Sequence, residues 1–275
     1  ISRPRAGWSE QNPEDWWWAT DRAVRSLPLE VRRAVVAIGL AGQMHGATLL
    51  DAANRPLRSA ILWNDGRAFA ECEMLEAAVP ALKQITGNIA MPGLTAPKLA
   101  WVRKYEPALF DQVRMVLLPK DFVRLCMTGE KASDLSDSAG TLWLDTGART
   151  WSDELLAATG LSRDHMPRVL EGTEVSGTLR ADLAAAWDMT RVIVAAGAGD
   201  NCAGAIGAGA IHEGDALLSL GTSGVLFVAT AGFRPNPEAA VHTFCHCLPA
   251  MWHQMSVHLS AASSLDWAAA LLGLD

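Results

Sequence analysis

The sequence has few basic residues and few cysteines, and each shortage excludes a class of protein. Its 275 residues include 23 Lys and Arg against 30 Asp and Glu, for a formal net charge of −7 at pH 7. No basic run is longer than the pair Arg32-Arg33, so a nucleic-acid surface is not expected and the expected partners are small molecules. An odd number of cysteines, scattered through a long chain, argues against a secreted disulfide framework and predicts a reducing, cytoplasmic setting. They are Cys72, Cys126, Cys202, Cys245 and Cys247.

Long apolar runs and several catalytic motifs are also missing. The longest apolar stretch, residues 193–211, is rich in Gly and Ala and is interrupted by Asp200 and Asn201, so no membrane span is expected. There is no Walker P-loop and no Gly-x-Ser-x-Gly elbow. Half of the residues are hydrophobic, which is enough for a sizeable core in one large domain or two ordinary ones.

The first part of the chain predicts a helix followed by paired strands. Asn12 before Pro13 has the pattern of a helix start, and we expect a helix to about Leu27. Residues 33–40 predict a buried strand that resumes at 47–50 after a loop, with a return strand at 59–63. Residues 66–160 are largely helical in pattern and are expected to form a lid-like insert.

The α/β pattern returns in the last third of the chain. Residues 191–196 predict a strand, 202–210 a helix of small residues, and 215–220 with 225–229 a β-hairpin. A domain boundary is expected near residues 211–214, where the pattern restarts.

Asp200 is the first candidate for catalysis, because it lies between a predicted strand and a helix in Gly197-Ala-Gly-Asp-Asn201. Open α/β sheets bind ligands at the carboxyl ends of strands, where a carboxylate can accept a proton from a hydroxyl. An ordinary helix-capping aspartate is the alternative. A dinucleotide site, and hence a dehydrogenase, is disfavoured because Cys202 stands where the fingerprint needs Gly or Ala.

The hairpin Gly221-Thr222-Ser223-Gly224 offers backbone amides and hydroxyls in one tight turn. Such a turn can hold phosphate oxygens without a lysine, although many glycine-rich hairpins bind nothing. Beside an acidic base it would complete a phosphotransfer site.

Two loops carry side chains suited to a sugar. In the first, His45 could donate to a hydroxyl while Met44 packs against the carbon skeleton, but a lone loop histidine is often structural. In the second, Trp63 and Arg67 accompany Asp65, which an internal Asp65–Arg67 pair would explain equally well.

The segment from His242 to Cys247 raises a zinc hypothesis. Cys245 and Cys247 alternate with His246 on a strand-like run, so their side chains are expected on opposite faces, unlike a Cys-x-x-Cys knuckle. A metal site is not expected here.

Seven motifs occur in the order seen in the FGGY family of carbohydrate kinases, and the chain resembles that family over essentially its whole length. The motifs span residues 8–17, 42–46, 62–67, 95–101, 118–121, 199–201 and 219–224.

The resemblance implies an actin-like, ribonuclease-H-like α/β fold with a cleft between two domains. It implies ATP-dependent phosphorylation of D-xylulose to D-xylulose 5-phosphate with Mg²⁺, Asp200 being the catalytic base and the candidate metal ligand. Met44, His45 and Asn201 would then contact the sugar. The residues Gly221, Thr222, Ser223 and Gly224 would form the phosphate-binding hairpin for ATP.

The chain departs from the family pattern at both ends. The family's opening Asp-x-Gly-Thr hairpin and its later Gly-rich adenosine segment do not occur in this sequence. We therefore expect residues 1–211 to be a sugar-binding domain without its first hairpin and residues 212–275 to begin a truncated nucleotide-binding domain, so that the chain alone is inactive. Other FGGY kinases, acting on ribulose, glycerol or gluconate, and a non-catalytic actin-like sensor of sugar or nucleotide remain alternatives. The consecutive Trp16 to Trp18 are a candidate contact surface for a homodimer.

Overall fold

The first helix, α1 (Pro13–Ser26), begins where the capping pattern predicts. The Asn12 side chain accepts a hydrogen bond from the Glu14 amide at 3.1 Å, and Pro13 occupies the first turn, where a missing N–H costs nothing. Trp17 packs against Trp187 with ring centroids 5.9 Å apart, whereas Trp18 is 62% exposed. The predicted start and length of this helix are confirmed.

The structure is a computed structural model that describes residues 1–258 and 260–274. The helices in it are α1, α2 (Leu29–Ala34), α3 (Phe69–Ala78), α4 (Leu82–Thr86), α5 (Thr95–Tyr105), α6 (Pro107–Phe110), α7 (Pro119–Thr128), α8 (Leu135–Ala139), α9 (Asp153–Ala158), α10 (Ala181–Ala186), α11 (Asp200–Gly207) and α12 (Ala262–Leu272), with 3₁₀ turns at Arg163–His165 and Pro237–Ala239. The short strands of the first part are β1 (Glu10–Gln11), β2 (Ala37–Ile38), β3 (Ala41–Gly42), β4 (Thr48–Leu50), β5 (Ala60–Ile61), β6 (Met115–Leu117), β7 (Ala132–Asp134), β8 (Leu144–Asp145), β9 (Thr150–Trp151), β10 (Arg168–Leu170), β11 (Val175–Thr178), β12 (Ile193–Ala195) and β13 (Ala198–Gly199). The longer strands of the last part are β14 (Ala216–Leu220), β15 (Gly224–Thr230), β16 (His242–Cys245) and β17 (Trp252–His258).

Parallel strand pairs bring distant segments of the chain together. Strand β12 pairs with β2, and β13 pairs with β3 in the register Ala198 with Ala41 and Gly199 with Gly42. Because the carboxyl ends of parallel strands lie at one edge, the loop after β3 and the start of α11 become neighbours. This pairing positions the candidate site.

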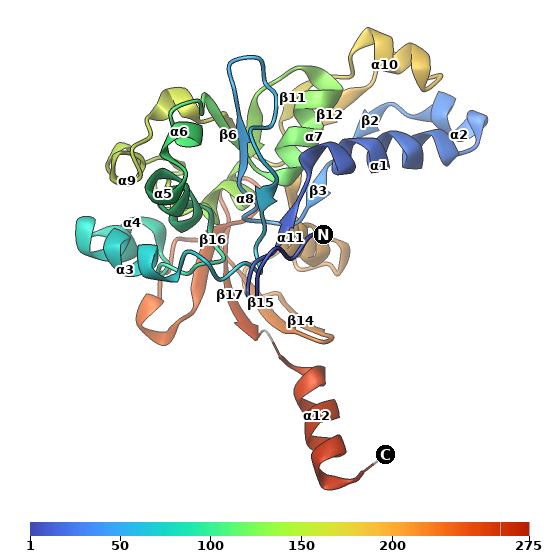
Figure 1. The fold of residues 1–275 in the computed structure, drawn as a ribbon. Helices are drawn as coiled ribbons and strands as arrows, with labels where there is room; N and C mark the ends of the chain where they lie inside the picture. Colours follow the sequence, from blue (N-terminus) through green and yellow to red (C-terminus); the bar gives the residue numbers. More distant parts are fainter. Residues whose placement is uncertain (259, 275) are drawn as a thin grey trace.

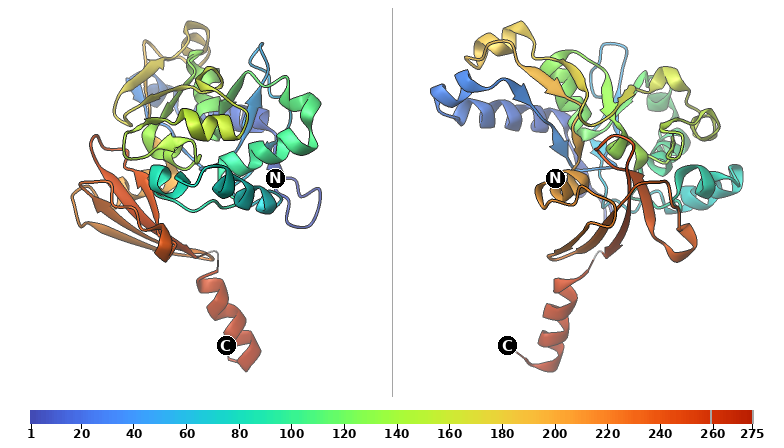
Figure 2. Two further views of the ribbon diagram at one scale, coloured as in Figure 1. Left: turned by 90° about the vertical axis from the view of Figure 1, so that its left-hand side faces the viewer. Right: turned by 180° about the vertical axis from the view of Figure 1, so that it is seen from behind.

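The last part of the chain forms an antiparallel sheet in the order β14, β15, β17, β16. The predicted hairpin is confirmed, with Leu220 opposite Gly224 at its closed end. Figures 1 and 2 show this sheet below the α/β body, with α12 projecting away from it. Several apolar side chains of α12 are exposed, among them Leu265 and Trp267. In the described part of the chain, no helix has the length and apolar character needed to cross a membrane.

The largest hydrophobic core lies where a lid was expected. Leu75 of α3, Leu99 of α5 and Trp143 beside β8 are all at most 2% exposed and belong to one buried cluster. Residues 66–160 therefore build the body of the domain, and they contain the strands β6 to β9 among their helices. The prediction of a lid was wrong, because the periodicity of an amphipathic helix does not show what its apolar face packs against.

Two element boundaries also differ from the prediction. Residues 33–40 do not form one buried strand, because α2 extends to Ala34 and only Ala37–Ile38 pair as β2, while Val36 is 75% exposed. Helix α11 begins at Asp200 rather than at residue 202, and Gly199 is its N-cap. The candidate base is therefore the first residue of the helix.

Candidate active site

The loop between β3 and β4 carries Met44 and holds His45 in a strained conformation. His45 has φ 68°, a left-handed value that is uncommon for a residue with a side chain. Gly46 is required after it, since a Cβ there would lie 2.5 Å from Cγ of Pro119. The turn is thus held tightly from the α7 side.

The surroundings of the His45 ring decide which of its nitrogens carries the proton. Nδ1 lies 2.8 Å from the carbonyl oxygen of Gly140. Burial, together with the nearby charge of Lys98, lowers the pKa of His45 to about 3, so the ring is neutral at physiological pH. A neutral ring facing a carbonyl through Nδ1 donates from that atom and keeps a lone pair on Nε2. The geometry favours acceptance from a ligand hydroxyl through Nε2 over the donation expected from the sequence.

Lys98 fixes the backbone of this loop through hydrogen bonds. Its ammonium donates to the carbonyl of His45 at 2.8 Å and to the carbonyl of Gly93 at 2.7 Å, and the residue is fully buried. Sequence reasoning missed this role, because no local pattern distinguishes a buried lysine in α5 from a solvated one.

Asp200 opens onto the same space from the first turn of α11. Its Oδ1 accepts hydrogen bonds from the backbone N–H of Asn201 at 2.9 Å and from its side-chain amide at 3.2 Å. Desolvation by the surrounding protein raises the pKa of Asp200, and the backbone hydrogen bonds oppose the shift. The helix N-terminus favours the ionised form of a carboxylate.

Met44, in the loop after β3, packs against Gly199, the residue before Asp200. A Cβ on Gly199 would lie 2.9 Å from Cγ of Met44, so only glycine at this position lets the methionine pack against the residue before Asp200.

Asp200 and the loop residues line one cavity of about 280 Å³. Its volume suits a small sugar, and its wall combines apolar and polar groups as ligand sites usually do. The lining residues are Met44, His45, Trp63, Asp200, Asn201, Ser219, Ser223, Val225, Met255 and Val257.

The four residues of the hairpin turn differ in whether they line the cavity. Ser223 lines the cavity, Gly221 and Thr222 are exposed at the tip, and Gly224 is buried. The carbonyl of Thr222 accepts from the Ala261 amide at 2.8 Å and from the Ser263 hydroxyl at 2.9 Å, which ties the tip to the start of α12. Of the predicted phosphate-binding residues, Ser223 is the one that lines the same cavity as Asp200.

Other cavity residues were not predicted. Ser219, Val225, Met255 and Val257 come from β14, β15 and β17. Met255 and Val257 are two positions apart and therefore share one face of β17, but sequence alternation does not reveal that this face meets Asp200.

The second sugar-like loop divides into a ligand-facing and a structural part. Arg67 forms a bidentate pair with Asp65 at 2.9 and 2.7 Å, and its guanidinium lies 3.6 Å from the Trp8 ring centroid. The internal-pair interpretation is confirmed, and Trp63 alone faces the cavity.

A larger hollow of about 560 Å³ lies elsewhere, over Arg58 and Tyr105. Arg58 already pairs with Glu10 and Glu106, each at 2.5 Å. The principal charges there are satisfied within the protein, so the smaller cavity at Asp200 is the better candidate.

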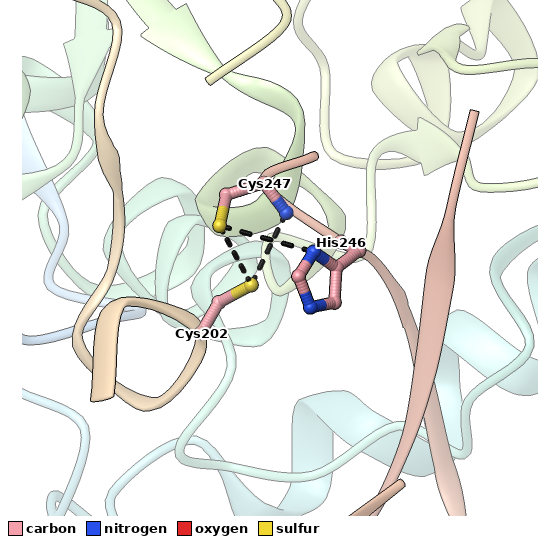
Figure 3. A group of neighbouring side chains, drawn as sticks. All are labelled: Cys202, His246 and Cys247. Atoms are coloured by element: carbon pink, nitrogen blue, oxygen red, sulfur yellow. Dashed lines mark hydrogen bonds between the residues drawn. The ribbon is translucent and has the colours of Figure 1, made fainter. Parts of the chain in front are cut away.

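The sequence argument against zinc assumed a continuous strand, and the structure shows that β16 ends at Cys245. His246 and Cys247 therefore lie beyond the strand, and they meet Cys202 of α11 (Figure 3). The prediction that these side chains diverge was wrong. None of the five cysteines is in a disulfide.

Comparison with known proteins places these features in a family. The chain belongs to the FGGY family of carbohydrate kinases, whose N-terminal domain matches residues 1–207. It is 60% identical to "Xylulose kinase" of Escherichia coli (strain K12) and 59% identical to that of Klebsiella pneumoniae, in each case over 100% of this chain and 57% of the relative. The chain thus spans little more than half the length of these relatives.

Solved structures agree. A crystal structure described as "a xyloylose kinase from Brucella ovis" superposes with TM-score 0.96 at 57% identity, covering 100% of this chain and 57% of that one. The fold is accordingly the actin-like fold of the FGGY sugar kinases, as the motif order implied.

Proposed function

We propose that this chain carries the sugar site and the catalytic base of an ATP-dependent kinase that converts D-xylulose to D-xylulose 5-phosphate. The observation that carries the proposal is the meeting of Asp200 with the Met44–His45 loop in one cavity of about 280 Å³. The names of the relatives at 60 and 59% identity support xylulose as the substrate.

The residues divide the chemistry among them. Asp200, whose pKa is raised by desolvation, accepts the proton from the sugar hydroxyl as that oxygen attacks the γ-phosphate. His45 accepts a hydrogen bond from a second hydroxyl through Nε2, and Asn201 orients both the base and the sugar. Met44 and Trp63 cover the carbon skeleton and exclude water.

ATP and Mg²⁺ are the expected co-substrate and cofactor. Mg²⁺ is usually bound through one or two carboxylates together with substrate phosphates, rather than in an all-protein cage. Asp200, with the hydroxyls of Ser219 and Ser223 on the same cavity wall, fits that donor set. Bound there, the metal would neutralise phosphate charge, and the hairpin 221–224 would position the phosphates.

We further propose that residues 1–211 form the sugar-binding domain and that residues 212–275 belong to the nucleotide-binding domain, which accords with the family match to residues 1–207. A cytoplasmic location belongs to the same proposal, as does a homodimer contact at the predicted Trp16 to Trp18 surface, where Trp18 is the exposed member.

The decisive experiment is Asp200→Asn in the protein as its gene encodes it. Loss of the general base should lower turnover by roughly 10² to 10⁴ while sugar binding changes little, because the amide preserves the shape of the site. Coupled ADP detection measures turnover and calorimetry measures binding of D-xylulose. Asp164→Asn, at an exposed acid outside the cavity, is the matched control.

A panel of D-xylulose, D-ribulose, glycerol and D-gluconate separates the related kinases. A clear preference for another member of the panel would replace the substrate, whereas tight sugar binding without any ADP release would favour the sensor. Wild-type turnover by the Asp200→Asn protein would refute the assignment of the base.

A further inference from the structure

Cys202 and Cys247 form a close pair of thiols that the phosphotransfer chemistry does not use. Their Sγ atoms are 3.2 Å apart although 45 residues separate them in sequence. Cys202 lies in the first turn of α11, two residues after Asp200, and Cys247 follows β16. Figure 3 shows both sulfurs turned toward each other, with the His246 ring beside them.

The hydrogen bonds give the two sulfurs different roles. The Cys202 thiol donates to the Cys247 sulfur, and this bond lowers the pKa of Cys247. The Cys202 sulfur in turn accepts from the Cys247 backbone N–H at 3.1 Å. The pair is thus polarised, with Cys202 as the hydrogen-bond donor and Cys247 as the sulfur on which the thiolate is favoured.

The remaining cysteines lack this arrangement. Cys126 is the most accessible of the five, but burial raises its pKa to about 11. Cys72 and Cys245 are buried with pKa values raised to about 12. Because the thiolate is the reactive form, accessibility predicts reaction at Cys126 and ionisation predicts reaction at Cys247.

A metal site at the same residues fits less well. Nδ1 of His246, the nitrogen nearer the sulfurs, already accepts from the Leu248 backbone N–H at 3.0 Å. Two thiolates bound to tetrahedral zinc, with bonds of about 2.3 Å, lie about 3.8 Å apart, which is wider than the observed separation of 3.2 Å. Within residues 1–258 and 260–274 the group brings together three ligand residues, one fewer than a closed structural site requires.

We propose that Cys202 and Cys247 are an oxidative modification site, which a peroxide converts to a disulfide and a small-molecule thiol reopens. The Cys247 thiolate attacks the O–O bond, takes one oxygen to become a sulfenic acid and releases hydroxide. The Cys202 sulfur then attacks the sulfenic sulfur and loses its proton; the S–S bond forms, the S–O bond breaks and water leaves. The two cysteines lose two electrons and the peroxide gains them.

The disulfide would join α11 to the turn after β16. Both cysteines already pack in an apolar cluster with Ala198, Ala205 and Phe227. Shortening the sulfur separation to about 2.05 Å therefore fixes the helix that begins with Asp200 against the antiparallel sheet. This goes beyond the proposed kinase function and does not depend on it.

The test uses the 275-residue chain treated with increments of hydrogen peroxide. After free thiols are blocked with N-ethylmaleimide, peptide mass spectrometry should find a Cys202–Cys247 cross-link that dithiothreitol removes, with Cys126 still reduced. The Tm should rise by several degrees on oxidation and return on reduction. Cys202→Ala should abolish the cross-link and leave a Cys247 sulfenic acid that dimedone traps, while the control Cys126→Ala should cross-link as the wild type does.

Three outcomes would overturn the proposal. One is oxidation that begins at Cys126, and another is loss of thiols without a Cys202–Cys247 cross-link. The third is stoichiometric retention of zinc by the reduced wild-type chain in equilibrium dialysis against zinc chloride, abolished in Cys202→Ala, since the pair would then be a metal site. The peptide map of the wild-type chain decides the first two even where a variant does not fold.

Discussion

Single residues in the site owe their chemistry to partners far away in sequence. His45 owes its tautomer to the carbonyl of Gly140, and that glycine is itself required because a Cβ there would overlap Cε1 of the His45 ring. The sequence motif identifies the histidine but does not indicate whether it donates or accepts.

The protonation state of His45 predicts a flat pH dependence for its contact with the sugar. A histidine with pKa about 3 stays neutral at every pH from about 5.5 to 8, whereas an ordinary histidine becomes mostly cationic at about 5.5. In an Asp200→Asn background, which removes the titration of the base, calorimetry should give equal D-xylulose affinity at both pH values. A drop of severalfold at the lower pH would mean that His45 is protonated there.

Lys98 predicts a stability effect of definite sign. Burial lowers its pKa to about 7 while Asp65 opposes the shift, so between about pH 7 and 10 the unfolded chain binds a proton that the folded chain has lost. The contribution of Lys98 to the free energy of unfolding is therefore smallest below pH 7. It rises with pH, by at most about 1.4 kcal/mol per pH unit.

Urea unfolding of the wild type and Lys98→Met at about pH 6.5 and 8.5 measures this effect. The stability of the wild type relative to the variant should increase at the higher pH, since the methionine does not titrate. A constant difference would show that Lys98 keeps its ordinary pKa.

At the scale of elements, short strands can pair because glycines allow their backbones to approach closely. Gly197 has φ +80°, and a Cβ on it would overlap the carbonyl oxygen of Leu40. This contact immediately precedes the pairing of β13 with β3 that positions Asp200 beside Met44.

We expect Gly197→Ala to destabilise the fold by at least about 3 kcal/mol and to weaken sugar binding, because the strain and the clash both act on this strand pair. Gly204→Ala is the matched control, since Gly204 lies inside α11 and a Cβ added to it would meet no other atom within 4 Å. The control should gain about 0.5 to 1 kcal/mol from helix propensity. Chemical unfolding compares the two, and equal stabilities would contradict the contact.

Sequence pattern predicted elements best where a local rule applies. The N-cap of α1 and the β14–β15 hairpin follow from residues within a few positions of each other. The prediction of a strand at residues 33–40 was wrong because an apolar run can be a buried strand or an exposed connection, and only the packing partner distinguishes the two.

At the scale of the whole molecule, a buried ionic cluster joins the elements beneath the site. The Lys120 ammonium lies 2.7 Å from Asp121, 2.7 Å from Asp134 and 3.1 Å from Asp137, and all four residues are at most 3% exposed. Arg124 continues the cluster and donates to the Ala195 carbonyl at 2.7 Å. The cluster therefore connects α7, β7, α8 and β12 across the body.

Burial raises the pKa of Asp137 well above its usual range, although Lys120 opposes the shift. The folded chain therefore holds a proton that the unfolded chain releases, and the stability from Asp137 is lost as pH rises. The stability of Asp137→Asn, which stays neutral, should therefore increase relative to that of the wild type between about pH 5 and pH 8.

In contrast, Asp134→Asn should cost about 3 kcal/mol or more of stability at both pH values, because it leaves buried Lys120 with one charged partner fewer. Thermal unfolding at the two pH values tests both, and an Asp137→Asn penalty that grows with pH would contradict the assignment.

The sequence by itself determined the helix start at Asn12, the glycine-bounded hairpin, the candidate base and the order of the family motifs. Each depends on a capping bond, an alternation or a spacing within a short stretch, where the backbone geometry is set locally. Only the tertiary structure decided that residues 66–160 build the core, that Nδ1 of His45 faces the Gly140 carbonyl, and that Cys202 meets Cys247. Those outcomes depend on which distant surfaces bury each other, and burial and dielectric surroundings are properties of the packed molecule rather than of any segment.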